Sequence, residues 1–178
     1  MALTSSIDDL LSTYDQALAH TDELWTDLTI DEVHWRADEN SSAIGWHLGH
    51  QPAVAHFMVR NLTAAEPSID VGLDTLMDSA TPPSDRGNLP DLEQLRFYRD
   101  TVADRVRLRV GDIRDGNVEA PDQLAVVAKV LLVSLINHEF QHSKWIGEVR
   151  TEVHGHALPA TPTSPMLSVI DGYSVVTG

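Results

Sequence analysis

The sequence LLVSLINHEFQHSKWI, residues 131–146, has the apolar spacing of a core helix and sets two histidines into its apolar face. Leu131, Leu135, His138 and His142 follow one another at spacings of three or four residues, the period of one helix face. Burying an imidazole costs free energy unless its nitrogens find partners. The two histidines of this core stripe therefore need partners inside the protein.

A second apolar stripe, over residues 41–62, includes His50 where an apolar residue would be expected. One inward-facing histidine usually pairs with a carbonyl or a hydroxyl group. Three histidines from two helices instead predict a metal site, because imidazole is the commonest protein ligand of borderline metals. We predict that His50, His138 and His142 hold a divalent metal (Zn, Fe, Ni or Mn) with positions open to water or substrate. His47, one turn before His50, is an alternative ligand or a cavity residue.

Residues 138–142 also spell HExxH, the zinc-peptidase motif in which the glutamate is the general base. A third ligand would have to be His154 or His156, which lie in a Pro/Gly-rich tail, so the context for a peptidase is poor. We expect Glu139 either to orient a ligand or to lie at the surface. The other histidines are expected at the surface or at helix ends: His20, His34 and His56.

Four long segments have helical periodicity: residues 6–28, 41–62, 90–110 and 120–150. Three shorter features connect or follow them: a helical turn started by Thr29, a short helix over 71–77, and a β-like stretch over 173–177. Pro52 lies inside the second segment and should bend it or make it irregular. The pattern predicts an all-α four-helix bundle over residues 1–150, with a non-helical C-terminal tail, 151–178, that packs on it.

The charge and the cysteine content of the chain exclude several classes of partner and site. The 178 residues include 27 acidic and 12 basic side chains, a net charge of −15, which repels phosphate backbones and anionic lipid. The chain has no cysteine, so disulfides and thiolate metal sites are excluded. We expect no secretory signal and no stretch of about 18 apolar residues, hence no membrane and a cytoplasmic location. Bundles of this size commonly form symmetric dimers, so we expect a homodimer without nucleic acid.

The motifs SAIGWHLGH (residues 42–50) and NHEFQH (137–142) resemble those of the DinB-like family of metal-binding four-helix bundles. The resemblance implies that His50, His138 and His142 hold a divalent metal. Within that superfamily the chain looks most similar to the N-terminal DinB domain of ergothioneine-type sulfoxide synthases. It shares with them a Trp-His-Leu-Gly-His phrase and stretches like RGNLP (86–90) and FYR (97–99). This closer likeness implies non-haem iron and oxygen-dependent chemistry.

The synthases use a second domain to complete their substrate site, whereas free-standing family members resemble thiol-dependent isomerases and S-transferases. We therefore expect a metal-dependent enzyme of the thiol-transferase or isomerase type, acting on a small molecule with a low-molecular-weight thiol. Two alternatives stay open: iron–oxygen chemistry, and a non-catalytic metal-binding or stress-related bundle. Polar and aromatic residues near the predicted metal are candidates for substrate contact: Trp46, Tyr98, Arg99, Asn137 and Gln141.

Overall fold

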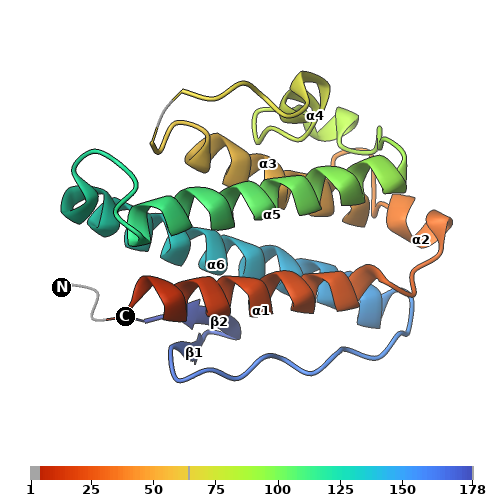
Figure 1. Cartoon of the computed structure of the whole chain (residues 1–178). Coiled ribbons are helices and arrows are strands. Elements are labelled where there is room, and N and C mark those ends of the chain that lie inside the picture. The colour runs from red at the N-terminus through yellow and green to blue at the C-terminus, as the bar shows by residue number, and fades with distance from the viewer. Residues whose placement is uncertain (1–4, 64, 178) are drawn as a thin grey trace. The chain divides into compact units, whose positions relative to one another are not determined.

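The computed structural model describes residues 5–63 and 65–177. The chain forms two compact units, one of residues 1–26 and 107–178 and the other of residues 27–106. Within the described residues the chain is mostly helical, with four long helices, two short ones and a small two-stranded sheet (Figure 1). The predicted fold class, a mostly helical bundle with a C-terminal tail, is confirmed.

Helices α1 (Ile7–Trp25) and α6 (Pro121–Glu152) lie side by side in the first unit (Figure 1). Ser6 caps α1: its hydroxyl accepts the Asp9 N–H, and the Asp9 carboxylate accepts the Ser6 N–H. Both helices bury apolar stripes, and a buried bond between the hydroxyls of Thr21 and Ser143, at 2.6 Å, links them. The stripes include Leu10, Tyr14, Leu18 and Leu24 on α1, and Leu132, Leu135, Ile136 and Ile146 on α6.

Arg150 joins three parts of this unit. The side chain is only 5% exposed. Its Nη1 donates to the Leu24 carbonyl at 2.9 Å, and its Nε donates to the Ala157 carbonyl at 2.8 Å. The guanidinium therefore ties α6 to the last turn of α1 and to the tail.

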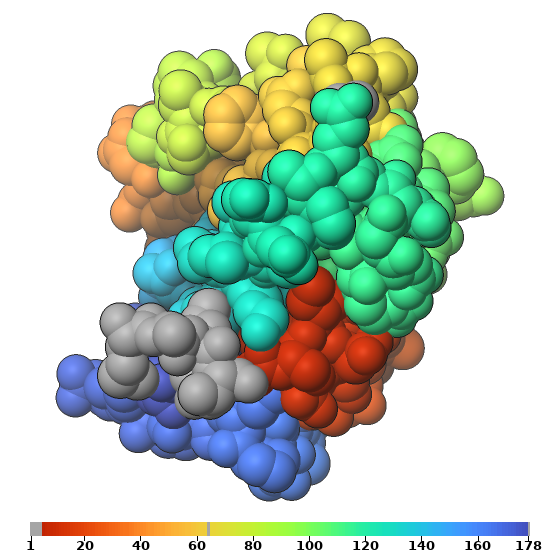
Figure 2. All heavy atoms as spheres, turned by 60° about the vertical axis from the view of Figure 1, so that its left-hand side comes forward, coloured from red at the N-terminus to blue at the C-terminus, as the bar shows by residue number. Residues whose placement is uncertain are grey.

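The tail ends in a β-hairpin of β1 (Leu167–Ile170) and β2 (Tyr173–Val176). The strands are antiparallel, and β2 packs on α6. Asp171 and Gly172 form the two-residue turn with φ of 51° and 81°, which suits an Asp-Gly pair. The β-like stretch was predicted, but its partner strand and the hairpin were missed. Figure 2 shows the blue C-terminal segment beside the red α1, where Thr13 Oγ1 lies 3.6 Å from the Met166 sulfur.

The second unit contains α2 (Ile30–His34), α3 (Ile44–Val59), α4 (Val71–Leu76) and the 3-10 turn η1 (Pro83–Asp85). The short helices α2 and α4 occur where predicted, capped by Thr29 and Asp70. Helix α3 is continuous through Pro52. It begins at Ile44, later than expected, because the hydroxyl of Ser41 donates to Asp38 and that of Ser42 accepts from Arg86.

Helix α5 (Leu92–Arg114) contributes residues to both units and is longer than predicted. The predicted end of this helix at residue 110 is wrong, because Gly111 lies within the helix. The apolar stripe continues one turn further, to Ile113, which is 2% exposed. The chain then turns at Gly116, whose φ of 74° is favourable for glycine.

Helix α6 contains an 18-residue window with a mean hydropathy of 1.4, so by length and composition it is apolar enough to cross a membrane. The sequence analysis expected no segment apolar enough to cross a membrane, and by this measure that expectation is wrong. The helix also contacts α1 and β2, and it carries the buried polar residues Glu139 and His142. Core helices of soluble proteins have the same properties.

Candidate metal centre

Two of the predicted ligands form a close pair on α6. The Nε2 atoms of His138 and His142 lie 3.0 Å apart, and the ring centroids are 4.4 Å apart. Two nitrogens bound to one zinc ion at about 2.1 Å, with angles of about 90–110°, are separated by about 3.0–3.4 Å. The pair therefore has the spacing of two ligands of one ion. Trp145 packs edge-on against His142 with centroids 4.9 Å apart.

The third predicted ligand, His50, lies on α3 in the second unit and is 6% exposed. Its Nδ1–H donates to the main-chain carbonyl of Met77 at 2.6 Å. Because the carbonyl can only accept, this bond places the proton on Nδ1 and leaves the lone pair on Nε2, as a metal ligand requires. Burial lowers the pKa of His50, which favours the neutral ring.

Trp46 fixes the plane of the His50 ring. The two rings stack with centroids 4.5 Å apart and planes 11° apart. The indole Nε1 donates to the Leu76 carbonyl at 3.3 Å, and the Arg86 guanidinium lies 4.3 Å from the centre of the indole. Trp46 is 2% exposed, so here it packs against a candidate ligand.

The other candidates for substrate contact have different surroundings. Tyr98 is 1% exposed, and its hydroxyl donates to Asp74 at 2.6 Å. Burial and this carboxylate raise the pKa of the phenol. Arg99 is also buried, whereas Gln141 is exposed on α6 next to His142. The structure thus places Trp46 beside His50 and Gln141 beside the α6 pair.

Glu139 lies between the two α6 histidines in sequence and is 4% exposed, so the surface alternative is wrong. Asn137 accepts the Val176 N–H on its Oδ1 at 2.7 Å, which fixes the hairpin to α6 one residue before His138. The prediction for His34 is confirmed, since it is exposed at the end of α2 with its Nδ1 2.8 Å from the Ile30 carbonyl.

His56 was expected at the surface or at a helix end: it lies in the last turn of α3, but the surface alternative is wrong because the residue is 0% exposed. Its Nε2 accepts the Ile69 N–H at 3.2 Å and lies 3.7 Å from Asp74. Burial lowers the pKa of His56, partly offset by that carboxylate. Asp74 also accepts the hydroxyl of Ser68, so it organises a polar cluster that sequence reasoning missed. The helix pattern gave no signal for it because its members come from separate segments.

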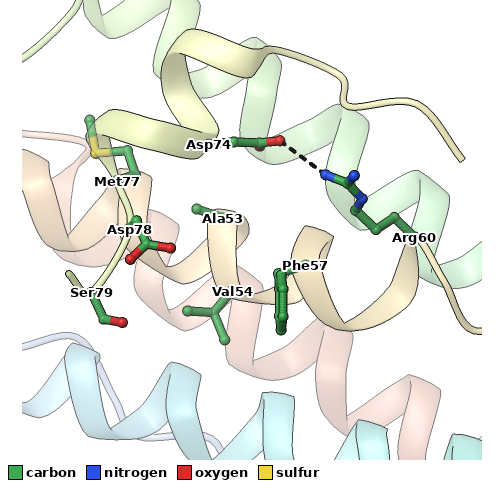
Figure 3. Close-up of a pocket in the computed structure, with 8 residues that line it drawn as sticks. All are labelled: Ala53, Val54, Phe57, Arg60, Asp74, Met77, Asp78 and Ser79. Atoms are coloured by element: carbon green, nitrogen blue, oxygen red, sulfur yellow. Dashed lines mark ion pairs between the residues drawn. The ribbon is translucent and has the colours of Figure 1, made fainter. Parts of the chain in front are cut away.

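A pocket of about 300 Å³ lies between α3 and the α4 segment (Figure 3). Its α3 wall includes Ala53 and Val54, three and four residues after His50 and therefore on the same side of the helix. The other wall includes Met77, whose carbonyl binds His50. At one end Arg60 pairs with Asp74 at 3.6 Å. The pocket thus adjoins the residues that orient His50.

A family model of the DinB superfamily matches residues 13–146. The chain therefore belongs to the DinB superfamily. No curated protein matches it. His50, His138 and His142 together offer three imidazole nitrogens, a donor set that could hold a metal ion.

Proposed function

We propose that the chain is a metal-dependent enzyme of the thiol-transferase or isomerase type, in which His50, His138 and His142 hold one divalent ion. The observation that carries the proposal is the 3.0 Å separation of the Nε2 atoms of His138 and His142 on one helix face. The bond from His50 Nδ1 to the Met77 carbonyl adds support, because ligating histidines commonly donate their second N–H to a carbonyl or carboxylate.

The donor set favours Lewis-acid chemistry. Three neutral imidazoles leave the charge of a divalent ion uncompensated, and such an ion lowers the pKa of a bound thiol or water. Non-haem iron oxygenases typically use two histidines and one carboxylate. The proposed set lacks that carboxylate, so the thiol-activating type is preferred to oxygen-dependent chemistry related to sulfoxide synthases.

The chain's own residues would orient the ligands and exclude water. Trp46 covers one face of His50 and is itself held by the Leu76 carbonyl. The pocket beside α3 offers a substrate both apolar surface, from Val54 and Phe57, and charged groups, from Arg60 and Asp78 (Figure 3). A pocket with charged groups at its edge, beside a candidate ligand, supports an enzyme, because a purely structural metal site would be closed.

The experiment loads untagged protein with Zn, Fe(II), Ni or Mn and measures alkylation of small thiols by a chromogenic electrophile. We expect a metal-dependent acceleration with at least one ion, lost in the His138→Ala/His142→Ala variant. The matched control, His34→Ala, removes an exposed histidine and should keep full activity. Stoichiometric metal binding without acceleration of any thiol reaction would contradict the enzymatic part and support a non-catalytic metal-binding bundle.

A further inference from the structure

We propose that the cavity between α6 and the C-terminal hairpin, beside His138, binds a small neutral or cationic molecule as the substrate or thiol partner of the metal centre. This inference rests on the proposed function. It goes beyond it by assigning a pocket, a charge class and a role for the hairpin.

The cavity has a volume of about 520 Å³, enough for a small organic molecule. One wall is a single face of α6, in which Ser134, His138 and Gln141 follow at spacings of four and three residues. The opposite wall is the hairpin. It contributes four residues: Ile170, Asp171, Tyr173 and Val175. A candidate metal ligand is therefore part of the wall of a cavity that the tail completes.

The hairpin is held in this position by specific contacts. The Val176 N–H donates to Asn137 Oδ1 at 2.7 Å, and the Lys144 ammonium lies 5.1 Å from the centre of the Tyr173 ring. Because strand residues alternate between two faces, Tyr173 and Val175 line this cavity, while Ser174 between them lines a different one. The register of β2 thus places the side chains of Tyr173 and Val175 in this cavity.

The lining determines which charge the cavity accepts. It offers hydroxyl groups, amides, an imidazole and two aliphatic side chains. Among the lining residues, all within the described part of the chain, Asp171 carries the one carboxylate and none is Lys or Arg. The ammonium of Lys144, beside Tyr173, is itself paired with Glu148, and a thiolate bound to the metal would offset part of the ion's charge. Away from the metal, the Asp171 carboxylate therefore favours neutral and cationic groups on the ligand.

The first arm of the test uses metal-free protein and the absence of native cysteine. Ser134→Cys introduces one thiol into the cavity, and its rate of reaction is measured with cationic and anionic methanethiosulfonate reagents. Adding Asp171→Asn should lower the cation-to-anion rate ratio severalfold, because the loss of one negative charge slows the cationic reagent and speeds the anionic one. Asparagine tolerates the positive φ at this position, so the turn is kept.

The control is Ser12→Cys, an exposed position on α1 outside the cavity lining, where Asp171→Asn should leave the ratio unchanged. An unchanged ratio at position 134, or an equal change at both positions, would overturn the assignment of Asp171 to this cavity.

The second arm uses protein loaded with Co(II). Binding of 2-aminoethanethiol and of 3-mercaptopropionate is followed by charge-transfer absorption, so the readout does not depend on activity. We expect the amine-bearing thiol to bind more tightly, and Asp171→Asn to reduce that preference severalfold, because the loss of one negative charge weakens binding of the cation and strengthens binding of the anion. Equal binding of both thiols, or a preference that survives the substitution, would overturn the ligand class. Protein that binds no Co(II) would instead overturn the proposed function, and this inference with it.

Discussion

His50 donates its Nδ1–H to the main-chain carbonyl of Met77 at 2.6 Å, so the segment after α4 orients a candidate metal ligand on α3. Met77 is 0% exposed, and its side chain packs against α3 one residue before His50, at Gly49. The position of the Met77 carbonyl therefore depends on how closely the segment after α4 approaches α3.

Gly49→Ala should disturb this approach. A Cβ at this position would lie 2.5 Å from the Met77 sulfur and 3.0 Å from Leu95 Cδ2, so buried side chains must move. Overpacking of this kind costs about 1–3 kcal/mol, and we also expect weaker metal binding because Met77 shifts. Urea unfolding of the metal-free protein and a metal titration measure the two effects.

The matched control is Gly111→Ala inside α5, where the nearest atom to a new Cβ is 4.0 Å away. This substitution should stabilise the protein by about 0.5–1 kcal/mol, because alanine loses less backbone entropy than glycine. Equal stability of the two variants would show that Gly49 is not required for close packing.

Arg150→Lys should be strongly destabilising. A lysine cannot reproduce the two directed bonds to the carbonyls of Leu24 and Ala157. Water cannot replace them either, because the side chain is only 5% exposed. Loss of a buried, charge-assisted bond that leaves a carbonyl unsatisfied costs about 2–4 kcal/mol. Arg114→Lys is the control, because its pairs with Asp8 and Asp115 are at the surface and should contribute little. Thermal unfolding measures both effects. An equal fall in the midpoints of the two variants would contradict a special role for the buried bonds of Arg150.

Stability should fall as the pH is lowered from 7.5 to 5.5, partly because of His56. Burial lowers its pKa in the folded protein, so below its ordinary value of about 6.5 the unfolded chain binds the proton more readily. The stability associated with neutral His56 is therefore complete above that value and is lost as the pH falls towards the folded pKa. His56→Gln removes the titrating group, and its amide oxygen can accept the Ile69 N–H. Chelator-treated wild type should show a steeper loss in urea unfolding than the variant, and parallel curves would refute the role of His56.

Local sequence patterns predicted much of the fold. Periodic apolar residues and the helix start at Thr29 predicted the helices, because both signals depend on residues within a few turns. Gly111 misled because the stripe to Ile113 outweighs the cost of one glycine. The hairpin was missed although Asp171 and Gly172 carry its turn signal, since half of it is exposed and weakly patterned.

Sequence analysis predicted the part of the candidate metal site whose ligands lie on one face of a single helix. His138 and His142 could be paired from their spacing alone. The support of His50 could not, because a main-chain carbonyl such as that of Met77 has no sequence signature. The burial of His56 was equally invisible, since its partners Ile69 and Asp74 come from a connection 13 or more residues later.

If His50, His138 and His142 hold one divalent ion, the purified protein should contain that ion in a stoichiometric amount. Untagged protein, purified without chelator and reconstituted with Fe(II), Zn(II), Ni(II) or Mn(II), should contain close to one equivalent by elemental analysis. His50→Ala and the His138→Ala/His142→Ala pair should lose that metal, and His34→Ala should retain it. Wild-type protein that takes up none of the four ions, or variants that retain a full equivalent, would contradict the three-histidine centre.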